Sequence, residues 1–291
     1  MTRNEQRATR NRYNLSMKIL VAHSPDPDDA FMFYAMVRDK IETGQYEFIQ
    51  VYHDIETLNR MCMRGEPDLS AASAAAYPLL WEKYLLMRAG ASVGKAYGPI
   101  IVARERLSPD DLKGLLVAVP GEMTTAFLAA RLAIGDFRHT VVPFDRIISA
   151  VRSGAADAGL LIHEGQLTYE NEGLSKVIDL GEWWDGETGL PLVLGVNLVK
   201  KSLGAEAIAD LTRILSRSIS YALTHREEAL AYAAGFGRGL DPEALGRFVD
   251  MYVNQQTEAM DEEALRGLSE LLGRARERGF VPEFRVEITG K

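Results

Sequence analysis

The sequence predicts an α/β protein built from two similar lobes, because one strand–turn–helix pattern occurs in each half of the chain. Residues 20–31 (LVAHSPDPDDAF) align without a gap to residues 116–127 (LVAVPGEMTTAF). Each segment is typical of an apolar strand, a proline-containing turn and a helix entered at Ala-Phe. Alternating strands and helices favour mostly parallel sheets. The length of 291 residues also suits two lobes better than one small core.

A second pair of similar segments follows the first. Residues 55–65 and 147–154 both read as helices that end at a glycine. In each case two residues separate that glycine from an aspartate, Asp68 or Asp157, which precedes a short apolar strand. The alternative is that any two βα units look alike. A true repeat would make the strand ends of the two lobes face each other across a cleft.

The remaining segments complete the predicted lobes. Residues 98–103 and 192–199 are strand-like and are expected to be the crossover strands of a hinge. From Ala205 onward the apolar spacing predicts helices that pack back onto the first lobe. The predicted organisation is a disordered tail over residues 1–16, a large lobe over 17–107 and 196–291, and a small lobe over 108–195.

Composition limits the classes of function. The chain is 47% hydrophobic and 25% charged, which is typical of a soluble globular protein, and its net charge of −8 gives nucleic-acid binding no electrostatic support. No segment approaches the roughly 20 apolar residues of a membrane span, and the polar N-terminus lacks the apolar core of a secretory signal. We therefore expect a cytoplasmic protein with a small-molecule ligand and no nucleic-acid or membrane partner. The oligomeric state stays open, with a homodimer among the alternatives.

His163 is the best candidate for chemistry. It ends the apolar run in residues 157–169 (DAGLLIHEGQLTY), at the carboxyl end of a predicted strand. Histidine can move protons near neutral pH, although a histidine at a strand end is often only structural. Glu164 is expected to point to the other side of an extended strand. The only cysteine, Cys62, is expected to be a buried apolar side chain.

Two turns are candidate ligand sites. The turn before residue 125 opens a helix, whose free N–H groups would bind an anion, with Thr124 and Thr125 as hydroxyl donors to a substrate carboxylate. The alternative is that one threonine merely caps the helix. In the first turn, Ser24 and Asp29 are candidate contacts for ligand hydroxyls, while a simple N-cap at Asp28 or Asp29 is favoured.

Further chemistry finds little support. Three acids, Asp26, Asp28 and Asp29, share the first turn, but no further spacing completes a metal site. Ser73 lies in a run of small residues where a flat ligand could approach the backbone, or where a helix packs closely. The sequence has neither a serine-nucleophile elbow nor a nucleotide-binding glycine motif, so serine nucleophile chemistry and a nucleotide cofactor find no support.

Together these segments resemble the 1,4-dihydroxy-6-naphthoate synthase family of the futalosine route to menaquinone. The resemblance runs from about Met17 to the C-terminal helices and rests on SPDPDDAFMFYA, DIETLN, YGPIIVAR, PGEMTTA, FDRII, LLIHEGQLTY and LGEWWDGETGLPLVLGVN. It implies a two-lobed fold like that of type II periplasmic binding proteins. It also implies a cofactor-free lyase that converts cyclic dehypoxanthine futalosine to 1,4-dihydroxy-6-naphthoate.

The resemblance assigns roles to individual residues. It implies His163 as proton acceptor and matches the family's small-residue substrate segment and Thr-Thr pair to Ser73, Ala74, Ala75, Thr124 and Thr125. The family's first turn usually reads SPCPNDT, whereas this chain has SPDPDDA. Two alternatives stay open: chorismate dehydratase of the same pathway, and a non-catalytic ligand-binding protein.

Overall fold

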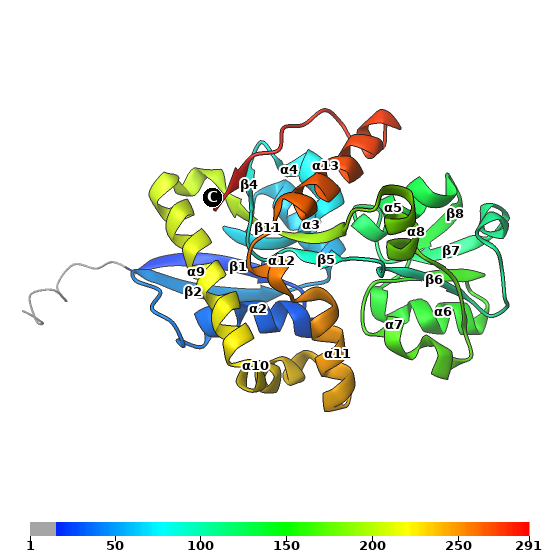
Figure 1. Ribbon diagram of the computed structural model, residues 1–291, viewed down its shortest axis with the longest axis horizontal. Coiled ribbons are helices and arrows are strands. Elements are labelled where there is room, and N and C mark those ends of the chain that lie inside the picture. The colour runs from blue at the N-terminus through cyan, green and yellow to red at the C-terminus, as the bar shows by residue number, and fades with distance from the viewer. Residues whose placement is uncertain (1–15, 291) are drawn as a thin grey trace, which may run out of the picture.

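The computed structural model describes residues 16–290 and has two lobes side by side (Figure 1). The tail predicted over residues 1–16 lies, except for Ser16, outside the described residues. The helices are α2 (Pro27–Val37), α3 (Ile55–Arg64), α4 (Tyr77–Leu80), α5 (Thr125–Ile134), α6 (Ile147–Ser153), α7 (Gly165–Thr168), α8 (Leu180–Thr188), α9 (Ala205–Thr224), α10 (Arg226–Ala233), α11 (Pro242–Tyr252), α12 (Gln255–Glu258) and α13 (Glu262–Glu277). Over the described part of the chain, no helix is long and apolar enough to cross a membrane.

Each lobe is built on one sheet. The large lobe has a seven-stranded sheet in the order β12-β4-β11-β3-β1-β2, with β5 also paired to β11; the small lobe has a five-stranded sheet in the order β10-β6-β9-β7-β8. The strands are β1 (Met17–His23), β2 (Tyr46–Tyr52), β3 (Leu69–Ser73), β4 (Tyr84–Met87), β5 (Ser92–Gly94), β6 (Ile100–Ala103), β7 (Leu116–Val119), β8 (Arg138–Val141), β9 (Ala158–Leu161), β10 (Ser175–Asp179), β11 (Leu192–Lys200) and β12 (Ile288–Thr289).

The repeat in the sequence is a repeat in the structure. β1 lies parallel between β2 and β3, and β7 lies parallel between β8 and β9. The two aspartates after the helix-ending glycines make the same contact in each lobe. Asp68 Oδ2 accepts from the Leu20 N–H at 3.0 Å, and Asp157 Oδ2 accepts from the Leu116 N–H at 2.9 Å. Each carboxylate therefore joins the start of one strand to its neighbour.

The two predicted crossover segments each complete the sheet of one lobe. β6 pairs antiparallel with β9, and β11 pairs antiparallel with β3. β6 lies before residue 107 in sequence, yet it belongs to the five-stranded sheet, so the chain changes lobe between β5 and β6. It returns before β11. The first connection passes close to the start of α8, because a Cβ at Gly181 would lie 2.0 Å from the Tyr97 carbonyl oxygen.

Helices cover the sheets and enclose separate cores. In the large lobe α2 and α9 pack together, and Ser218 ties them by donating to the Met32 carbonyl at 2.7 Å. In the small lobe Trp184 is fully buried, and its indole N–H donates to the Pro191 carbonyl. Cys62 is also buried, which raises the pKa of its thiol to about 11 and agrees with the predicted apolar role.

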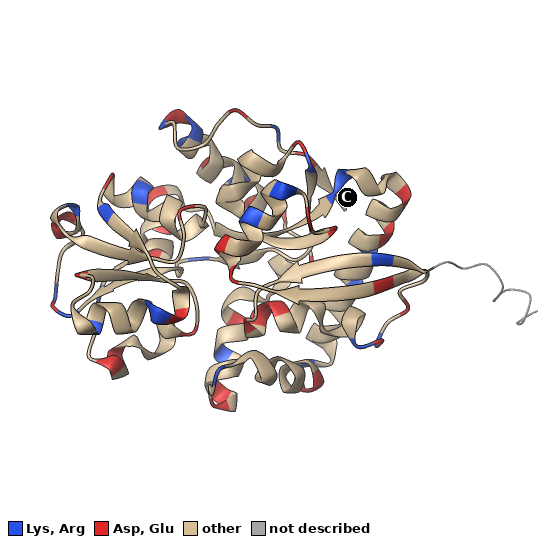
Figure 2. Ribbon diagram, turned by 180° about the vertical axis from the view of Figure 1, so that it is seen from behind, with Lys and Arg blue, Asp and Glu red and all other residues tan. Residues whose placement is uncertain are grey.

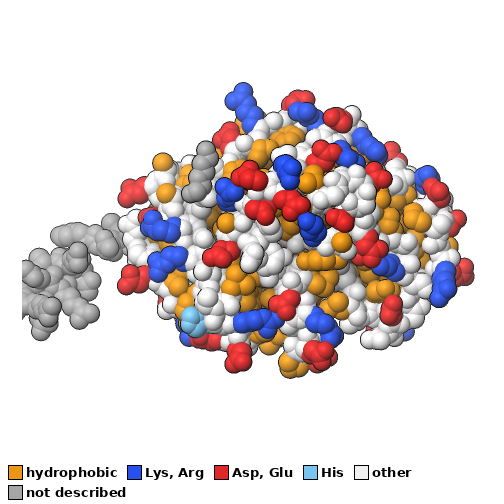
Figure 3. Space-filling model, in the orientation of Figure 1, with side chains coloured by type: hydrophobic (Ala, Val, Ile, Leu, Met, Phe, Trp, Pro, Cys, Tyr) orange, Lys and Arg blue, Asp and Glu red, His pale blue; other side chains and the backbone are white. Residues whose placement is uncertain are grey.

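Charged residues of both signs are spread along the ribbon of both lobes (Figure 2). On the face in Figure 3, acidic and basic side chains alternate, with apolar side chains between them. On that face, the net negative charge is therefore dispersed.

Candidate active site

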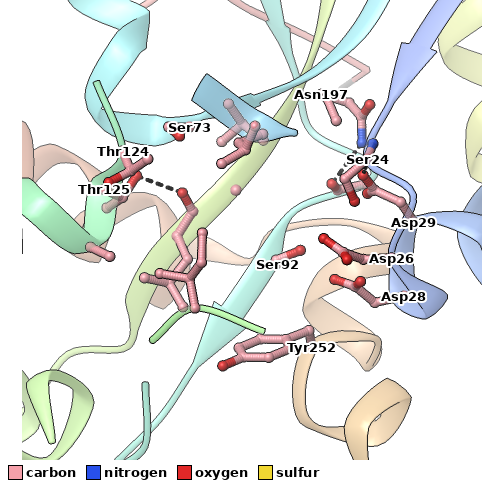
Figure 4. Close-up of a pocket in the computed structure, with 18 of the residues that line it drawn as sticks. Ser24, Asp26, Asp28, Asp29, Ser73, Ser92, Thr124, Thr125, Asn197 and Tyr252 are labelled. Atoms are coloured by element: carbon pink, nitrogen blue, oxygen red, sulfur yellow. Dashed lines mark hydrogen bonds between the residues drawn. The ribbon is translucent and has the colours of Figure 1, made fainter. Parts of the chain in front are cut away.

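A pocket lies between the two lobes (Figure 4). Its lining comes from the turn after β1, the end of β3, the middle of β11, the start of α5 and the end of α11. The lining residues used below are Ser24, Asp26, Asp28, Asp29, Ser73, Thr124, Thr125, Ala126, Ile162, Asn197 and Tyr252. Five of the predicted substrate-binding residues thus share one pocket: Ser24, Asp29, Ser73, Thr124 and Thr125.

The two threonines have hydroxyls that are already engaged. Thr124 is the N-cap of α5, and its Oγ1 accepts from the Phe127 N–H and donates to the Gly121 carbonyl. Thr125 Oγ1 donates to the Leu194 carbonyl at 2.6 Å and accepts from the Ala75 N–H at 3.1 Å. A hydroxyl has one hydrogen to donate. The predicted role as hydroxyl donors to a carboxylate is therefore not available in this conformation.

The backbone at the start of α5 is free to bind an anion instead. Among the described residues, the N–H groups of Thr125 and Ala126 have no hydrogen-bond acceptor, and both residues line the pocket. The first turn of α5 carries no acidic side chain, whereas α2, its counterpart in the repeat, begins with Asp28 and Asp29. Since the N-terminus of a helix attracts negative charge, a ligand carboxylate would bind at α5 and not at α2.

Ser73 presents a hydroxyl donor to the pocket. Its backbone N–H donates to Asn59 Oδ1 at 2.8 Å, and its Oγ accepts from Asn59 Nδ2 at 3.0 Å. The Ser73 hydroxyl hydrogen has no acceptor in the described part of the chain and is left for a ligand. Ala74 and Ala75 follow in a short turn of helix and are buried, but they are not among the residues that line the pocket.

The prediction that Asp28 or Asp29 is the N-cap of the first helix is wrong. Asp26 is the N-cap residue of α2, and its side chain makes no capping bond. Asp28 and Asp29 lie inside the first turn because Pro27 occupies the first helical position, which its fixed φ favours. Asp29 accepts from the Ser24 N–H at 2.8 Å and stabilises the turn. Burial, and then the neighbouring carboxylates, raise the pKa of Asp28 well above its usual range.

His163 lies beside the pocket with both ring nitrogens bonded to the protein. Nε2 donates to the Phe144 carbonyl at 2.7 Å, and Nδ1 accepts from the Gly165 N–H at 3.0 Å. Its neighbour Ile162 lines the pocket, but His163 does not. A carbonyl can only accept, so the neutral ring carries its hydrogen on Nε2.

The expectation that Glu164 faces away from His163 is wrong. The strand β9 ends at Leu161, and Glu164 adopts helical dihedral angles, so the alternation of an extended strand does not apply. Glu164 Oε2 lies 3.5 Å from His163 Nδ1. Burial alone would lower the pKa of His163, but the Glu164 carboxylate and the Phe144 carbonyl outweigh it and raise that pKa above its ordinary value.

Three lining or supporting residues carried no sequence signal. Asn59 holds Ser73 from α3, and Tyr252 donates its hydroxyl to Gln166 Oε1 across the lobes at 3.1 Å. Asn197 is buried and donates to the Gly90 carbonyl, while its Oδ1 has no partner among the described residues. The amide oxygen of Asn197 is therefore a buried acceptor that lacks a partner among these residues. Over the same residues, no three metal-binding side chains lie close enough together to hold an ion.

Comparisons with known proteins agree on one family. A family model described as "Menaquinone biosynthesis" matches residues 19–277. A 1,4-dihydroxy-6-naphthoate synthase of Thermus thermophilus is 41% identical over 258 residues, which cover 89% of this chain and 94% of the relative. A 1,4-dihydroxy-6-naphthoate synthase of Streptomyces coelicolor is 36% identical over 268 residues, which cover 90% of this chain and 94% of the relative.

Solved structures agree on the fold. A crystal structure of a protein from Archaeoglobus fulgidus has a TM-score of 0.87 and 47% identity, covering 91% of this chain and 98% of that one. The alkanesulfonate-binding protein SsuA of Xanthomonas axonopodis has a TM-score of 0.70 at 12% identity, covering 91% and 94%. The second likeness shows the two-lobed periplasmic-binding-protein fold alone.

Proposed function

This chain belongs to the menaquinone biosynthesis family, and from that premise we propose that it cleaves a carbon–carbon bond in cyclic dehypoxanthine futalosine to release 1,4-dihydroxy-6-naphthoate. Its two curated relatives are both 1,4-dihydroxy-6-naphthoate synthases, so it is an enzyme of this pathway and not a transport protein. This also separates it from the chorismate dehydratase alternative. We place the reaction in the cytoplasm, where a biosynthetic role fits; the homodimer stays a prediction.

The observation that carries the proposal is the open start of α5 inside the interlobe pocket. The free N–H groups of Thr125 and Ala126 would bind the substrate carboxylate, which the product retains. The Ser73 hydroxyl would donate to a second polar group on the substrate. Ala71 and Val196 add apolar surface for a flat ring system.

In this proposal His163 is the base that abstracts the proton which starts cleavage. Its Nδ1 lone pair now accepts from the Gly165 N–H, so substrate binding must turn the ring or shift the start of α7 to present it. The Phe144 carbonyl holds the Nε2 hydrogen and so fixes the tautomer in which Nδ1 is the basic atom. Aromatisation of the released naphthoate supplies the driving force. The closed lobes exclude water and align the base.

The direct test is an activity assay on purified protein. We expect cyclic dehypoxanthine futalosine to be converted to 1,4-dihydroxy-6-naphthoate without added cofactor, and we expect His163→Ala to abolish most of this turnover. Loss of water from chorismate would instead support the dehydratase. Tight binding of the futalosine derivative with no turnover would reject the catalytic proposal.

A further inference from the structure

One arginine joins the two lobes at the mouth of the pocket. Arg238 lies between α10 and α11 in the large lobe, and its side chain contacts Glu164, the residue just before α7 in the small lobe. Figure 1 labels these three helices. Nη1 donates to both carboxylate oxygens of Glu164, at 2.8 and 2.9 Å. Nη2 donates to Asp26 Oδ1 at 2.6 Å and to the Pro25 carbonyl at 3.1 Å. The guanidinium thus connects the first turn of the large lobe to the start of α7.

The same guanidinium touches the groups that hold His163. Glu164 lies 3.5 Å from His163 Nδ1, and the Phe144 ring lies 4.8 Å under the Arg238 guanidinium, within the range of a cation–π contact. The Phe144 carbonyl accepts from His163 Nε2. Arg238 therefore contacts Glu164 and Phe144, two residues that interact directly with the imidazole.

Burial and backbone geometry indicate a contact that is held in place. The side chains of Arg238, Asp26 and Glu164 are only 30%, 21% and 13% exposed, so solvent screens them less than an ordinary surface pair. Arg238 also has a φ of 46°, in the left-handed region that residues other than glycine rarely adopt. The surrounding contacts must compensate for that conformation.

We propose that Arg238 is a positioning residue that clamps the lobes together by joining Asp26 to Glu164, and that this clamp holds His163 in place for the reaction. The catalytic part of the inference rests on the proposed function, whereas the closure part does not. The clamp lies at the pocket opening, since Asp26 lines the pocket. A charged contact at this opening can be broken and formed again between turnovers, which substrate entry and product release require.

The test compares Arg238→Met with Arg238→Lys and with a matched control, Arg226→Met. Arg226 carries the same charge and forms an ion pair with Asp250 at 2.7 Å, but both of these residues belong to the large lobe. Two readouts need no substrate: hydrogen exchange of the α7 amides, and the radius of gyration from small-angle scattering. The third is kcat and KM for the cyclic futalosine substrate.

For Arg238→Met we expect faster exchange in α7 and a larger radius of gyration, while Arg226→Met matches the wild type. Misplacing the base should lower kcat by about 10- to 100-fold with a smaller change in KM. Arg238→Lys should restore part of both effects, because lysine keeps the charge but not the forked geometry.

Unchanged exchange and radius in Arg238→Met would overturn the clamp, whatever happens to kcat. Unchanged kcat in an opened variant would overturn its link to His163. If the wild type itself fails to turn over the substrate, the proposed function is wrong while the exchange and scattering results still decide closure. If Arg238→Met does not fold, Arg238→Lys and Asp26→Asn provide the same comparison.

Discussion

Replacing Glu164 by glutamine tests whether this carboxylate sets the ionisation of the proposed base. Glu164 is ionised throughout the neutral range: burial opposes this, but His163 and Arg238 hold its pKa at about 2. Its charge lies 3.5 Å from His163 Nδ1 and favours the imidazolium form. The other charged groups that face this cluster are Asp26 and Arg238.

The size of the effect follows from the distance. Two unit charges 3.5 Å apart interact by about 1.2 kcal/mol in a medium with the dielectric constant of water. We use this value because Arg238 binds the same carboxylate and offsets part of its charge. At about 1.36 kcal/mol per pKa unit, removing the Glu164 charge should lower the pKa of His163 by about 0.9 unit.

The direction in which the acid limb of kcat/KM moves follows from the lowered pKa of His163. A base works in its neutral form, so activity is lost as the pH falls through the pKa of His163. Lowering that pKa lets the neutral form persist to more acidic pH. The acid limb of kcat/KM for naphthoate release should therefore move about one pH unit downward in Glu164→Gln.

The control for this assay is Glu172→Gln. Glu172 is also in the small lobe, but it pairs with Arg152 and not with His163. The acid limb of the kcat/KM profile of Glu172→Gln should therefore match that of the wild type. The Glu164 variant should also turn over more slowly, because the Arg238 clamp is weakened, but the position of the limb on the pH axis is independent of that loss. A limb that stays in place or moves upward in Glu164→Gln would refute the reasoning.

Substitutions at three further positions test the site and the repeat. His163→Ala should lower turnover by about 10²–10⁴-fold, so near-native turnover would contradict the base. Thr125→Val should cost about 1–3 kcal/mol of unfolding free energy in denaturant titrations, because it leaves a buried N–H and carbonyl without their hydroxyl partner. Thr125→Ser should keep that stability, and an equal loss in both variants would show that packing matters instead. Asp157→Ala should cost about 1.5–3 kcal/mol through the lost contact to the β7 amide, and an unchanged midpoint would contradict that role.

The fold could be predicted from the sequence because its information is local and occurs twice. Glycine, two residues, aspartate and strand mark the same junction in each lobe, and Asp68 and Asp157 prove to make the same backbone contact. The lobe to which β6 belongs could not be predicted in this way. A four-residue apolar strand fits either sheet, and long-range pairing decides between them.

The site was predictable only where a residue ends a strand or starts a helix. Ser73 and Thr125 satisfy that condition and line the pocket. Arg238 and Tyr252 come from a region of helices far along the chain, where no periodic pattern marks a residue that reaches the other lobe. The predicted direction of the Glu164 side chain was wrong because the sequence does not show that β9 ends at Leu161. The backbone is helical at Glu164, so its side chain does not follow the alternation of a strand.

The insertion of the small lobe between β5 and β11 affects the order in which the chain can fold during synthesis. β3 receives its antiparallel neighbour only when β11 is made, about 120 residues later, and at about 5–20 residues per second that interval is roughly 6–24 seconds. During this time the edge of β3 that pairs with β11 in the finished protein stays unpaired. A chain released or stalled in that interval would expose an unpaired, apolar strand edge, which is a site for aggregation. The half-life of nascent chains truncated before and after residue 200 should therefore differ sharply, although both contain the entire small lobe.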